Sequence, residues 1–503
     1  MCGIAGIWGA ADMTLVQEMI DKLSHRGPDA EGMYRCPKGH GVLGHRRLSI
    51  MDPAGGNQPL YNENRSKAII ANGAIYNFPA LRQQLATHHA FRTGNDSEVI
   101  LHLYEEFDQA VVNHLDGMFA FAIADGKSLF AARDPIGIKP LYYGQKGNDF
   151  YFASELKAFP RQMETVYEFP SGTCYHSSRG FTPFHQIPNH SPLDMPLDYR
   201  LSSLRQTLKK AVVKRLMSDV PLGTFLSGGL DSSIIAAIAR QQMDELHSFS
   251  VGIEGSHDLE AARLVAHHLD TIHHEYIFTS EEVLEVLPDV IYHLESFDQD
   301  LVRSAIPCYF VSRLARDDVK VILTGEGADE LFAGYTYYKE IQGSEPLHRE
   351  LRRSVAALHN INLQRVDRLT MAHSIEGRVP FLDLELINLA MTIPPSLKLY
   401  DERRRQRIEK WILRKAAADL LPPEIIWRSK AQFDEGSGTV DLLQRIVSHQ
   451  MTPAEASKYR ATQPEIKLRS PEECFYHRIF IEVFEAPELI SPNVGRWSER
   501  PMF

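Results

Sequence analysis

An apolar run, a glycine- and serine-rich loop and a second apolar run follow one another near the middle of the chain, and they constrain its fold most strongly. Residues 221–226, Pro-Leu-Gly-Thr-Phe-Leu, have the pattern of a buried strand. Further along, Ile234, Ile235 and Ile238 recur on one side of a predicted helix. Residues 227–233, Ser-Gly-Gly-Leu-Asp-Ser-Ser, connect the two, and the glycines permit a tight turn in which backbone N–H groups approach a ligand. Because a helix dipole favours an anion at the N-terminus, this unit predicts an anion site.

The chemistry of this loop differs from that of a Walker loop, since it contains no Gly-Lys-Ser or Gly-Lys-Thr. Asp231 adds a carboxylate beside the anion site, as expected if Mg²⁺ accompanies the phosphates. The loop resembles the pyrophosphate loop of ATP pyrophosphatases, which cleave ATP to AMP and pyrophosphate. The alternative is an ordinary Gly-Ser turn between a strand and a helix.

The chain before this unit predicts a different kind of structure. Residues 119–123 alternate phenylalanine or isoleucine with alanine, and the following Asp-Gly at 125–126 indicates a hairpin. Similar patterns through residues 1–185 predict antiparallel β-structure with few helices. Residues 186–200 hold three prolines and no apolar periodicity, which is typical of a linker.

Strands and helices alternate after the linker. Residues 247–251, 274–278 and 320–324 have strand patterns, and residues 258–269 between the first two have a helix pattern. This alternation predicts a doubly wound parallel sheet with ligands at the carboxyl ends of the strands. We therefore predict an α/β protein with an N-terminal αββα sandwich over 1–185, a second domain over 201–440 and a C-terminal helical extension over 441–503.

Charge and cysteine content exclude several classes of protein. The net charge is −11 at pH 7, and binding to a phosphate backbone needs a basic face, so we expect no general nucleic-acid binding. The five cysteines are scattered, and no CxxC or Cys/His cluster indicates zinc. We expect buried thiols in a reducing cytoplasm. No signal peptide and no membrane-spanning apolar run are recognised.

The start of the chain carries a cysteine at position 2. A small residue there allows removal of Met1, which would give Cys2 a free α-amine and place nucleophile and base in one residue. The alternative is a small buried cysteine at the start of a strand. Polar residues at Asn72 and Gly73 interrupt a predicted strand, which usually marks a turn, bulge or site, and Asp96 precedes a predicted helix.

With the His-Arg-Gly-Pro-Asp and Gly-His-Arg-Arg-Leu-Ser motifs nearby, the N-terminal domain resembles the glutamine amidotransferase domain of the N-terminal nucleophile hydrolase type. The resemblance implies two antiparallel sheets between helices, and attack of Cys2 on the side-chain amide of glutamine to form a thioester. It implies that the Asn72 side chain and the Gly73 N–H hold the oxyanion. It also implies that Arg47 pairs with the substrate carboxylate and that Asp96 accepts from the substrate ammonium.

One position departs from the family motif Asn-Gly-Glu-Ile-Tyr-Asn, because this chain has Ala74 in place of the glutamate. That glutamate normally helps to bind the substrate amine. Losing a charge-assisted hydrogen bond costs about 1.5–3 kcal/mol, so we expect roughly ten- to a hundredfold weaker glutamine binding unless another residue compensates.

Carboxylates and glycines follow the predicted strand at 320–324. Residues 324–335 read Thr-Gly-Glu-Gly-Ala-Asp-Glu-Leu-Phe-Ala-Gly-Tyr. The plain interpretation is an acidic helix N-terminus, which the dipole favours. The functional interpretation makes Asp329 a second Mg²⁺ ligand opposite Asp231 and places Glu326 at the reacting carbonyl.

Together with the loop at 227–233, this segment resembles the glutamine-dependent asparagine synthetases. Further matching stretches are 294–298, Arg303, 376–383 and 427–430. The residues that the resemblance implies for ATP and pyrophosphate are Leu226, Ser227, Gly228, Gly229, Asp231, Ser232, Val251, Thr324, Gly325 and Lys430.

The resemblance also implies the reaction and its substrates, which are glutamine, aspartate and ATP. The aspartate side-chain carboxylate attacks the α-phosphate of ATP, and ammonia released at Cys2 travels inside the protein to the acyl carbon. Glu326 is our hypothetical general base. Arg303 is a weaker candidate for holding the aspartate carboxylate, with a plain helix-surface arginine as the alternative.

Other interpretations stay open at this stage. One is a related amide ligase that acts on a sugar, a peptide or an antibiotic precursor. Another is a regulatory or scaffolding protein without turnover, which only Ala74 favours. The oligomeric state is not determined by the sequence, and a homodimer is our working hypothesis.

Some histidines and the end of the chain carry no functional prediction. His273 and His274 have no carboxylate at ligand spacing, so we expect structural or surface histidines. Residues 403–405, three arginines, predict a solvated helix surface. Beyond about residue 440 no motif is recognised, and Trp497 is expected only to anchor the tail.

Overall fold

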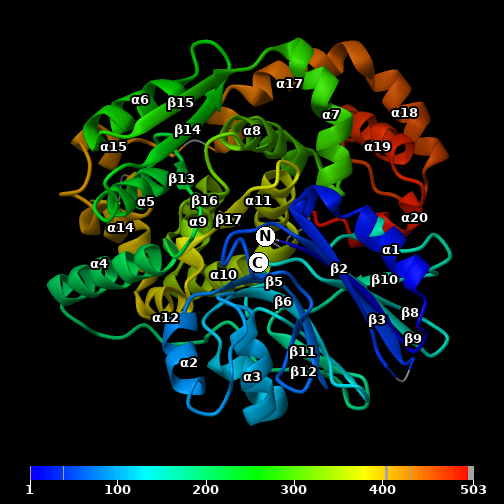
Figure 1. Ribbon diagram of the computed structural model, residues 1–503. Helices are drawn as coiled ribbons and strands as arrows, with labels where there is room; N and C mark the ends of the chain where they lie inside the picture. The colour runs from blue at the N-terminus through cyan, green and yellow to red at the C-terminus, as the bar shows by residue number, and fades with distance from the viewer. Residues whose placement is uncertain (1, 38, 403–405, 431, 497–503) are drawn as a thin grey trace.

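The structure is a computed structural model that describes residues 2–37, 39–402, 406–430 and 432–496 (Figure 1). Two antiparallel sheets form the N-terminal half, and one parallel sheet surrounded by helices forms the C-terminal half. The predicted α/β architecture is confirmed.

Each antiparallel sheet has six strands. In spatial order the first consists of β10 (Val166–Glu168), β8 (Tyr142–Lys146), β9 (Asp149–Ala153), β1 (Gly3–Trp8), β3 (Gly41–Arg47) and β2 (Ala30–Arg35). The second consists of β12 (Gly180–Pro183), β11 (Thr173–His176), β7 (Leu129–Arg133), β6 (Gly117–Ala124), β5 (Ala68–Ile75) and β4 (Leu60–Tyr61). The accompanying helices are α1 (Met13–Asp21), α2 (Phe78–Leu85) and α3 (Glu98–Phe107).

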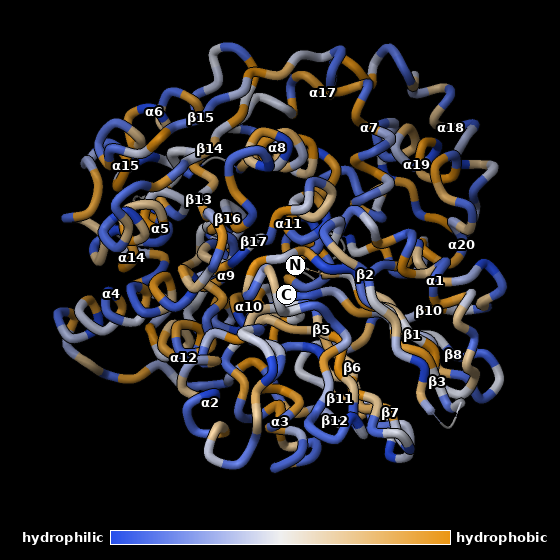
Figure 2. The backbone as a smooth tube through the Cα atoms, in the orientation of Figure 1, coloured by the Kyte–Doolittle hydropathy of each residue, from blue (hydrophilic) through white to orange (hydrophobic). Residues whose placement is uncertain are grey.

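The two sheets pack face to face because their central strands are apolar on both sides. Along β6, Phe119 and Phe121 pack beneath α3, while Ala120 and Ala122 pack against the first sheet. Figure 2 shows β5 and β6 coloured mainly as hydrophobic. Since α1 contacts β1 and β3, the layers follow the predicted order of helix, sheet, sheet and helix.

The C-terminal sheet is parallel, and β13 (Leu222–Phe225), the first of its strands in chain order, lies in the centre. The strands are β15 (Ile272–Ile277), β14 (His247–Gly252), β13, β16 (Val321–Leu323) and β17 (Glu376–Arg378). The helices that follow or cover them are α4 (Leu197–Lys214), α5 (Leu230–Arg240), α6 (His257–Leu269), α7 (Ser280–Leu294), α8 (Gln299–Ala315), α9 (Ala328–Phe332), α10 (Ser344–Ala356), α11 (Asn362–Met371), α12 (Leu384–Thr392) and α14 (Trp411–Ala416).

Helices cover both faces of this sheet, as a doubly wound fold requires. Phe249 and Val251 on β14 share a core with α7 and α8, whereas Leu226 and Leu323 share another core with α5. The carboxyl ends of β13 and β16 therefore meet at one edge, where the loops at 227–229 and 325–327 begin.

The structure adds detail at the predicted linker and at the C-terminal extension. Helix α4 starts at Leu197, inside the predicted linker 186–200, because Pro196 sits at its N-cap while the first apolar residues remain exposed and hide the period. The C-terminal helices α17 (Thr439–Gln450), α18 (Pro453–Thr462), α19 (Pro471–Val483) and α20 (Pro487–Ile490) share one core with α7 and α8. The predictions for residues 403–405 and Trp497 lie outside the described residues.

Buried ion pairs join the two halves. Arg26 Nη1 lies 2.6 Å from Glu155 Oε1 and 2.7 Å from Asp367 Oδ2, so one buried guanidinium links the N-terminal half to α11. Arg368 Nη1 lies 3.2 Å from Glu155 Oε1, and Arg368 Nη2 lies 3.0 Å from Glu295 Oε2. Removing one partner of a buried pair costs about 3–5 kcal/mol, because the other charge is left uncompensated. These ion pairs hold the N-terminal half against α7 and α11 of the C-terminal half.

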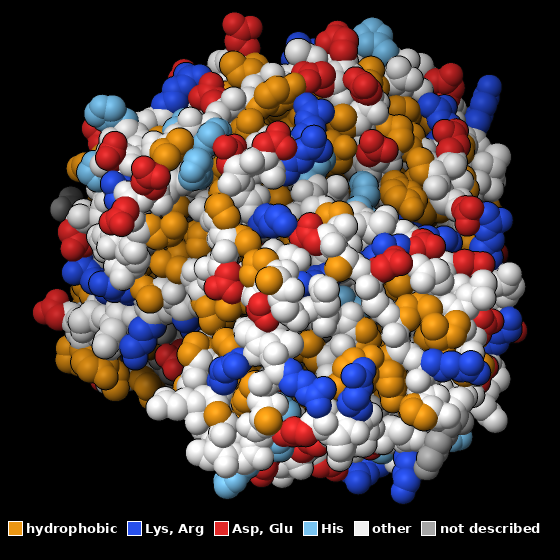
Figure 3. Space-filling model, viewed as in Figure 1, with side chains coloured by type: hydrophobic (Ala, Val, Ile, Leu, Met, Phe, Trp, Pro, Cys, Tyr) orange, Lys and Arg blue, Asp and Glu red, His pale blue; other side chains and the backbone are white. Residues whose placement is uncertain are grey.

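Figure 3 shows Lys and Arg side chains interspersed with Asp and Glu on the face viewed. Within the described parts of the chain, no helix has both the length and the apolar character needed to cross a membrane.

Candidate active sites

A small pocket in the N-terminal half brings together the residues predicted to handle glutamine. Cys2 lies directly before β1, Asn72 and Gly73 lie on β5, and Arg47 ends β3. The pocket is lined by Cys2, Arg47, Leu48, Ile50, Met51, Gln58, Ala71, Gly73, Ala74, Asn95, Asp96, Ser97, Glu376 and Arg378. The predicted residues thus come from four separate segments to one place.

The Cys2–Asn72 pair has the geometry of a nucleophile beside an oxyanion donor. The Cys2 backbone nitrogen donates to Asn72 Oδ1 over 3.1 Å. The other atom of this amide, Nδ2, therefore stays available to donate to a substrate oxygen. Asn72 Nδ2 is buried and has no hydrogen-bond partner among the described residues. Burial raises the pKa of the Cys2 thiol, so a base is needed to generate the thiolate.

Asp96 and Arg47 contribute opposite charges to the pocket. Asp96 accepts a hydrogen bond from the Ile75 N–H over 2.7 Å rather than capping helix α3, whose N-cap is Ser97. Burial raises the pKa of Asp96 to about 6. The Arg47 guanidinium donates to the loop at 51–57, including Asn57 Oδ1 over 2.6 Å, so it also holds that loop in place.

The opposite half of the chain supplies a wall of this pocket. Glu376 and Arg378 of β17 line it, with Arg378 Nε 2.7 Å from Glu376 Oε1. A carboxylate therefore enters the pocket from β17, while Ala74 provides none from β5. Neither residue was predicted from the sequence to belong to a site, although both lie in the stretch 376–383, which matches the family.

The second pocket lies at the carboxyl ends of the parallel strands. Of the residues predicted for ATP and pyrophosphate, those that line it are Leu226, Ser227, Gly229, Asp231, Ser232, Val251, Thr324, Gly325 and Lys430. Glu326 and Asp329 line it as well. The two predicted loops therefore meet as the parallel sheet requires.

Gly228 allows the first loop to fold tightly. Its φ is +67°, and a Cβ there would lie 2.5 Å from Ala261 Cβ on α6, so only glycine fits. The turn brings Ser227 Oγ within 3.2 Å of Ser232 Oγ and places Gly229 as the N-cap of α5. Hydroxyls and the first N–H groups of a helix thus face the pocket, as an anion site needs.

Two carboxylates and two lysines form the charged centre of the pocket. Lys410 Nζ contacts Asp231 Oδ2 and lies 2.6 Å from Asp329 Oδ1, and Lys430 Nζ lies 2.7 Å from Asp329 Oδ2. Although burial acts in the opposite direction, Lys410 and Lys430 lower the pKa of Asp329. Asp231 Oδ1 is buried without a hydrogen-bond partner among the described residues. Converging carboxylates with an unused oxygen are donors that suit Mg²⁺.

Glu326 follows the end of β16 and pairs with Arg365 of α11. Arg365 is almost fully buried and lines the same pocket, so it holds the Glu326 side chain at the pocket wall. Arg365 and Lys410 were missed because neither belongs to a motif, and only the tertiary fold brings α11 and the start of α14 to this edge.

Arg303 is not brought to this pocket. Its Nε lies 2.8 Å from Glu472 Oε1, and its Nη2 contacts Glu472 Oε2, so the guanidinium makes a two-pronged pair with α19. It is absent from the residues that line the pocket. Its predicted role toward aspartate stays a prediction, which this pairing disfavours.

The histidine prediction is partly corrected. His273 is structural, as predicted, since its two ring nitrogens lie 2.8 and 2.9 Å from Ser248 Oγ and Ser250 Oγ. His274, however, does have a carboxylate nearby, because its Nδ1 lies 3.7 Å from Asp318 Oδ2. Asp318 is 44 positions further along the chain, so local spacing does not indicate it.

Comparisons with known proteins agree with this division into two sites. Residues 1–176 match the family described as glutamine amidotransferase domain, and residues 203–344 and 339–489 match the family described as asparagine synthase. An "Asparagine synthetase [glutamine-hydrolyzing]" of Triphysaria versicolor is 42% identical over 462 residues, which cover 87% of this chain and 78% of that protein. "Asparagine synthetase [glutamine-hydrolyzing] 2" of Arabidopsis thaliana is 40% identical over 510 residues, which cover 96% of this chain and 88% of that protein.

Proposed function

Because the chain belongs to the glutamine-hydrolysing asparagine synthetase family, we propose that its two pockets carry the two half-reactions of asparagine synthesis. The N-terminal pocket hydrolyses glutamine, and the C-terminal pocket converts aspartate and ATP to asparagine, AMP and pyrophosphate. The observation that carries this proposal is the convergence of the 227–233 loop, Asp231 and Asp329 around one pocket in a chain that also buries Cys2 beside Asn72.

In the first half-reaction Cys2 is the nucleophile. After removal of Met1, its α-amine takes the thiol proton, and the sulfur adds to the side-chain amide carbon of glutamine. Asn72 Nδ2 and the Gly73 N–H stabilise the oxyanion, an effect worth about 2.7–4 kcal/mol per donor. Ammonia leaves, and water then cleaves the thioester to release glutamate. Arg47 and Asp96 bind the carboxylate and the ammonium of the substrate.

In the second half-reaction the aspartate side-chain carboxylate attacks the α-phosphorus of ATP, and pyrophosphate leaves. The loop 227–233 and Lys430 bind the phosphates, while Leu226, Val251 and Gly325 surround the adenosine. Mg²⁺, if held by Asp231 and Asp329, would offset the negative charge of the phosphates. The ammonia nitrogen attacks the acyl carbon and loses a proton to Glu326, and AMP leaves from the same carbon.

One pair of strands connects the two pockets. Glu376 and Arg378 on β17 line the Cys2 pocket, and β17 pairs in parallel with β16, whose carboxyl end leads to Gly325 and Glu326. We infer that ammonia passes beside these strands, since this is where the walls of the two pockets belong to neighbouring strands.

Further proposals concern the setting of the enzyme. The division into domains at 186–200 and a homodimer stay predictions. The five cysteines are buried and free, which supports a reducing compartment such as the cytoplasm. The net charge of −11 supports a small-molecule enzyme rather than a nucleic-acid-binding protein.

The test compares asparagine synthesis with two nitrogen sources, glutamine and ammonium. With ATP, Mg²⁺ and aspartate, both glutamine and ammonium should yield asparagine, AMP and pyrophosphate in equal amounts. Cys2→Ser should abolish the glutamine-driven reaction and preserve the ammonium-driven one. The control Cys174→Ser, at another buried thiol, should preserve both. Formation of ADP and phosphate, or AMP only with a carboxylate other than aspartate, would contradict the proposal.

A further inference from the structure

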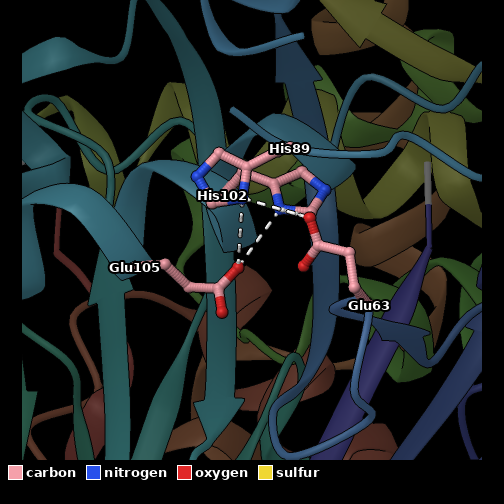
Figure 4. A group of neighbouring side chains, drawn as sticks. All are labelled: Glu63, His89, His102 and Glu105. Atoms are coloured by element: carbon pink, nitrogen blue, oxygen red, sulfur yellow. Dashed lines mark hydrogen bonds and ion pairs between the residues drawn. The ribbon is translucent and has the colours of Figure 1, made fainter. Parts of the chain in front are cut away.

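Four side chains outside both pockets gather on the outer part of the N-terminal half (Figure 4). Glu63 lies between β4 and β5, His89 follows α2, and His102 and Glu105 lie on α3. Each offers one atom suited to a metal, and these four atoms all lie within 4.8 Å of one another. Neither half-reaction uses any of them.

The four histidine–glutamate distances in the cluster are close to those that a small tetrahedral ion requires. His89 Nδ1 lies 3.2 Å from Glu63 Oε1 and 3.7 Å from Glu105 Oε2. His102 Nδ1 lies 3.2 Å from Glu105 Oε2 and 4.0 Å from Glu63 Oε1. A tetrahedral zinc ion with bonds of about 2.0–2.2 Å separates its ligand atoms by roughly 3.3–3.5 Å. The four distances scatter around that value, so small side-chain shifts suffice.

Both imidazole rings are oriented as they are in metal sites. Each presents Nδ1 to the centre of the cluster and Nε2 to a further carboxylate outside it. His89 Nε2 lies 2.9 Å from Glu106 Oε1, within hydrogen-bond distance, whereas His102 Nε2 is buried 3.7 Å from Glu98 Oε1 and has no hydrogen-bond partner among the described residues. Metal-bound histidines almost always have such a partner on the other nitrogen, because it fixes the ring and makes it a better ligand.

The ligands are also held in place before any ion binds. His102 and Glu105 are one turn apart on α3 and therefore project from one face of the helix. Glu105 Oε1 accepts from Asn62 Nδ2 over 2.7 Å, and Glu63 Oε1 accepts from the Ala90 N–H over 3.0 Å. The His102 side chain is fully buried, whereas that of Glu63 is 37% exposed, which leaves an entry path from solvent.

We propose that Glu63, His89, His102 and Glu105 bind a divalent transition-metal ion, with zinc as the best fit. Two imidazoles and two carboxylates complete a tetrahedral shell without a position for substrate, which is the pattern of a structural site. Two carboxylates also neutralise the charge of the ion. The ion would tie the segment before β5, the segment after α2 and helix α3 together, and Ser97, the N-cap of α3, directly follows Asp96 of the glutamine pocket.

The test measures zinc on the intact chain, independently of activity. The protein is stripped with a chelator and titrated with Zn²⁺ by calorimetry, and its melting temperature is followed with and without Zn²⁺. His89→Gln and Glu63→Gln should each weaken zinc binding at this site at least tenfold and remove the zinc-dependent rise in melting temperature. Co²⁺ should give the visible absorption of a tetrahedral ion in the wild type and lose it in both variants.

His88→Gln is the matched control, since this exposed neighbour of His89 is not part of the cluster. It should bind zinc as the wild type does. Glu63→Gln keeps the test valid if His89→Gln fails to fold, because Glu63 is partly exposed. A second group, His247, His274 and Asp318, could also bind zinc. Zinc bound there would be unchanged in the His89 and Glu63 variants, so only the binding that these variants lose belongs to the cluster. Unchanged zinc affinity and melting behaviour in Glu63→Gln, or no zinc binding by the wild type, would overturn the proposal.

Discussion

The two pockets solve opposite electrostatic problems. The Cys2 pocket contains the buried Asn72 Nδ2, which has no hydrogen-bond partner among the described residues, and the desolvated Asp96 carboxylate, which accepts from the Ile75 N–H. The second pocket instead pairs its charges in advance, with Lys410 between Asp231 and Asp329. A neutral amide and a single ammonium need only a few donors and acceptors, whereas a triphosphate brings several negative charges that lysines must offset. The pockets therefore should respond differently to the loss of a single charge.

The largest effect is expected where charges are already paired. Lys410→Met should lower aspartate-dependent AMP formation by about a thousandfold with glutamine and with ammonium, because two carboxylates lose their shared cation. Glutamine hydrolysis should continue, since Lys410 lines the second pocket and not the first. Steady-state AMP and glutamate assays check both statements. Lys415→Met, at an exposed lysine on α14, is the control. An equal loss of glutaminase activity would break the comparison.

Removal of the oxyanion donor should affect only the first pocket. Asn72→Ala should lower the kcat of glutamine hydrolysis by roughly a hundredfold, the effect of losing one such donor. Ammonium-driven asparagine synthesis should remain within about twofold of wild type, because no group of the second pocket changes. A defect in the ammonium-driven reaction would show that the two pockets are not separable.

Restoring a carboxylate at position 74 should strengthen glutamine binding in the first pocket. Ala74→Glu should lower the KM for glutamine about tenfold or more, since it adds a charge-assisted hydrogen bond to the substrate ammonium. Ala68→Ser, at a small buried residue of the same strand that does not line the pocket, should leave the KM within about twofold. An unchanged KM in Ala74→Glu would mean that the pocket already has its second carboxylate, for which Glu376 is the residue in place.

The smallest effect is a pH dependence that follows from the pKa of Asp96. Burial raises that pKa to about 6, so the carboxylate that we propose accepts the substrate ammonium is half ionised near pH 6 and almost fully ionised from about pH 7. Glutamine affinity should therefore be constant from pH 7 to 8 and fall up to about tenfold per pH unit below pH 6. Calorimetry with Cys2→Ser, which cannot turn glutamine over, measures this directly. Asp96→Asn should bind weakly at every pH, and a pH-dependent Asp96→Asn would point to another group.

The parts of the fold that rest on local periodicity could be predicted from sequence. The strand at 222–225, the helix from Leu230 and the strand–helix alternation after them lie where the apolar patterns place them. The start of α4 was missed because its first turn is exposed and has no apolar period. The C-terminal helices were predicted as an extension, but sequence patterns do not reveal that they share the core of α7 and α8.

The candidate sites divide in the same way. Residues within motifs, such as Asp231 and Asp329, come together as predicted. Lys410 and Arg365 act through positions that only the folded chain creates, so no local pattern indicates them. The group around His89 and His102 is similar, because three segments supply its members and only the His102–Glu105 spacing is local.

The wall that β17 gives to the glutamine pocket has a practical consequence. A fragment that ends near residue 185 would keep the cysteine, its amide neighbour and both sheets, yet it would lack Glu376 and Arg378 and would leave Arg26 without Asp367. The glutamine pocket of such a fragment would lack one wall, so the ammonia that it released would enter bulk water. Replacing the N-terminal half of this enzyme with that of a relative therefore requires that β17 of the C-terminal half be replaced as well.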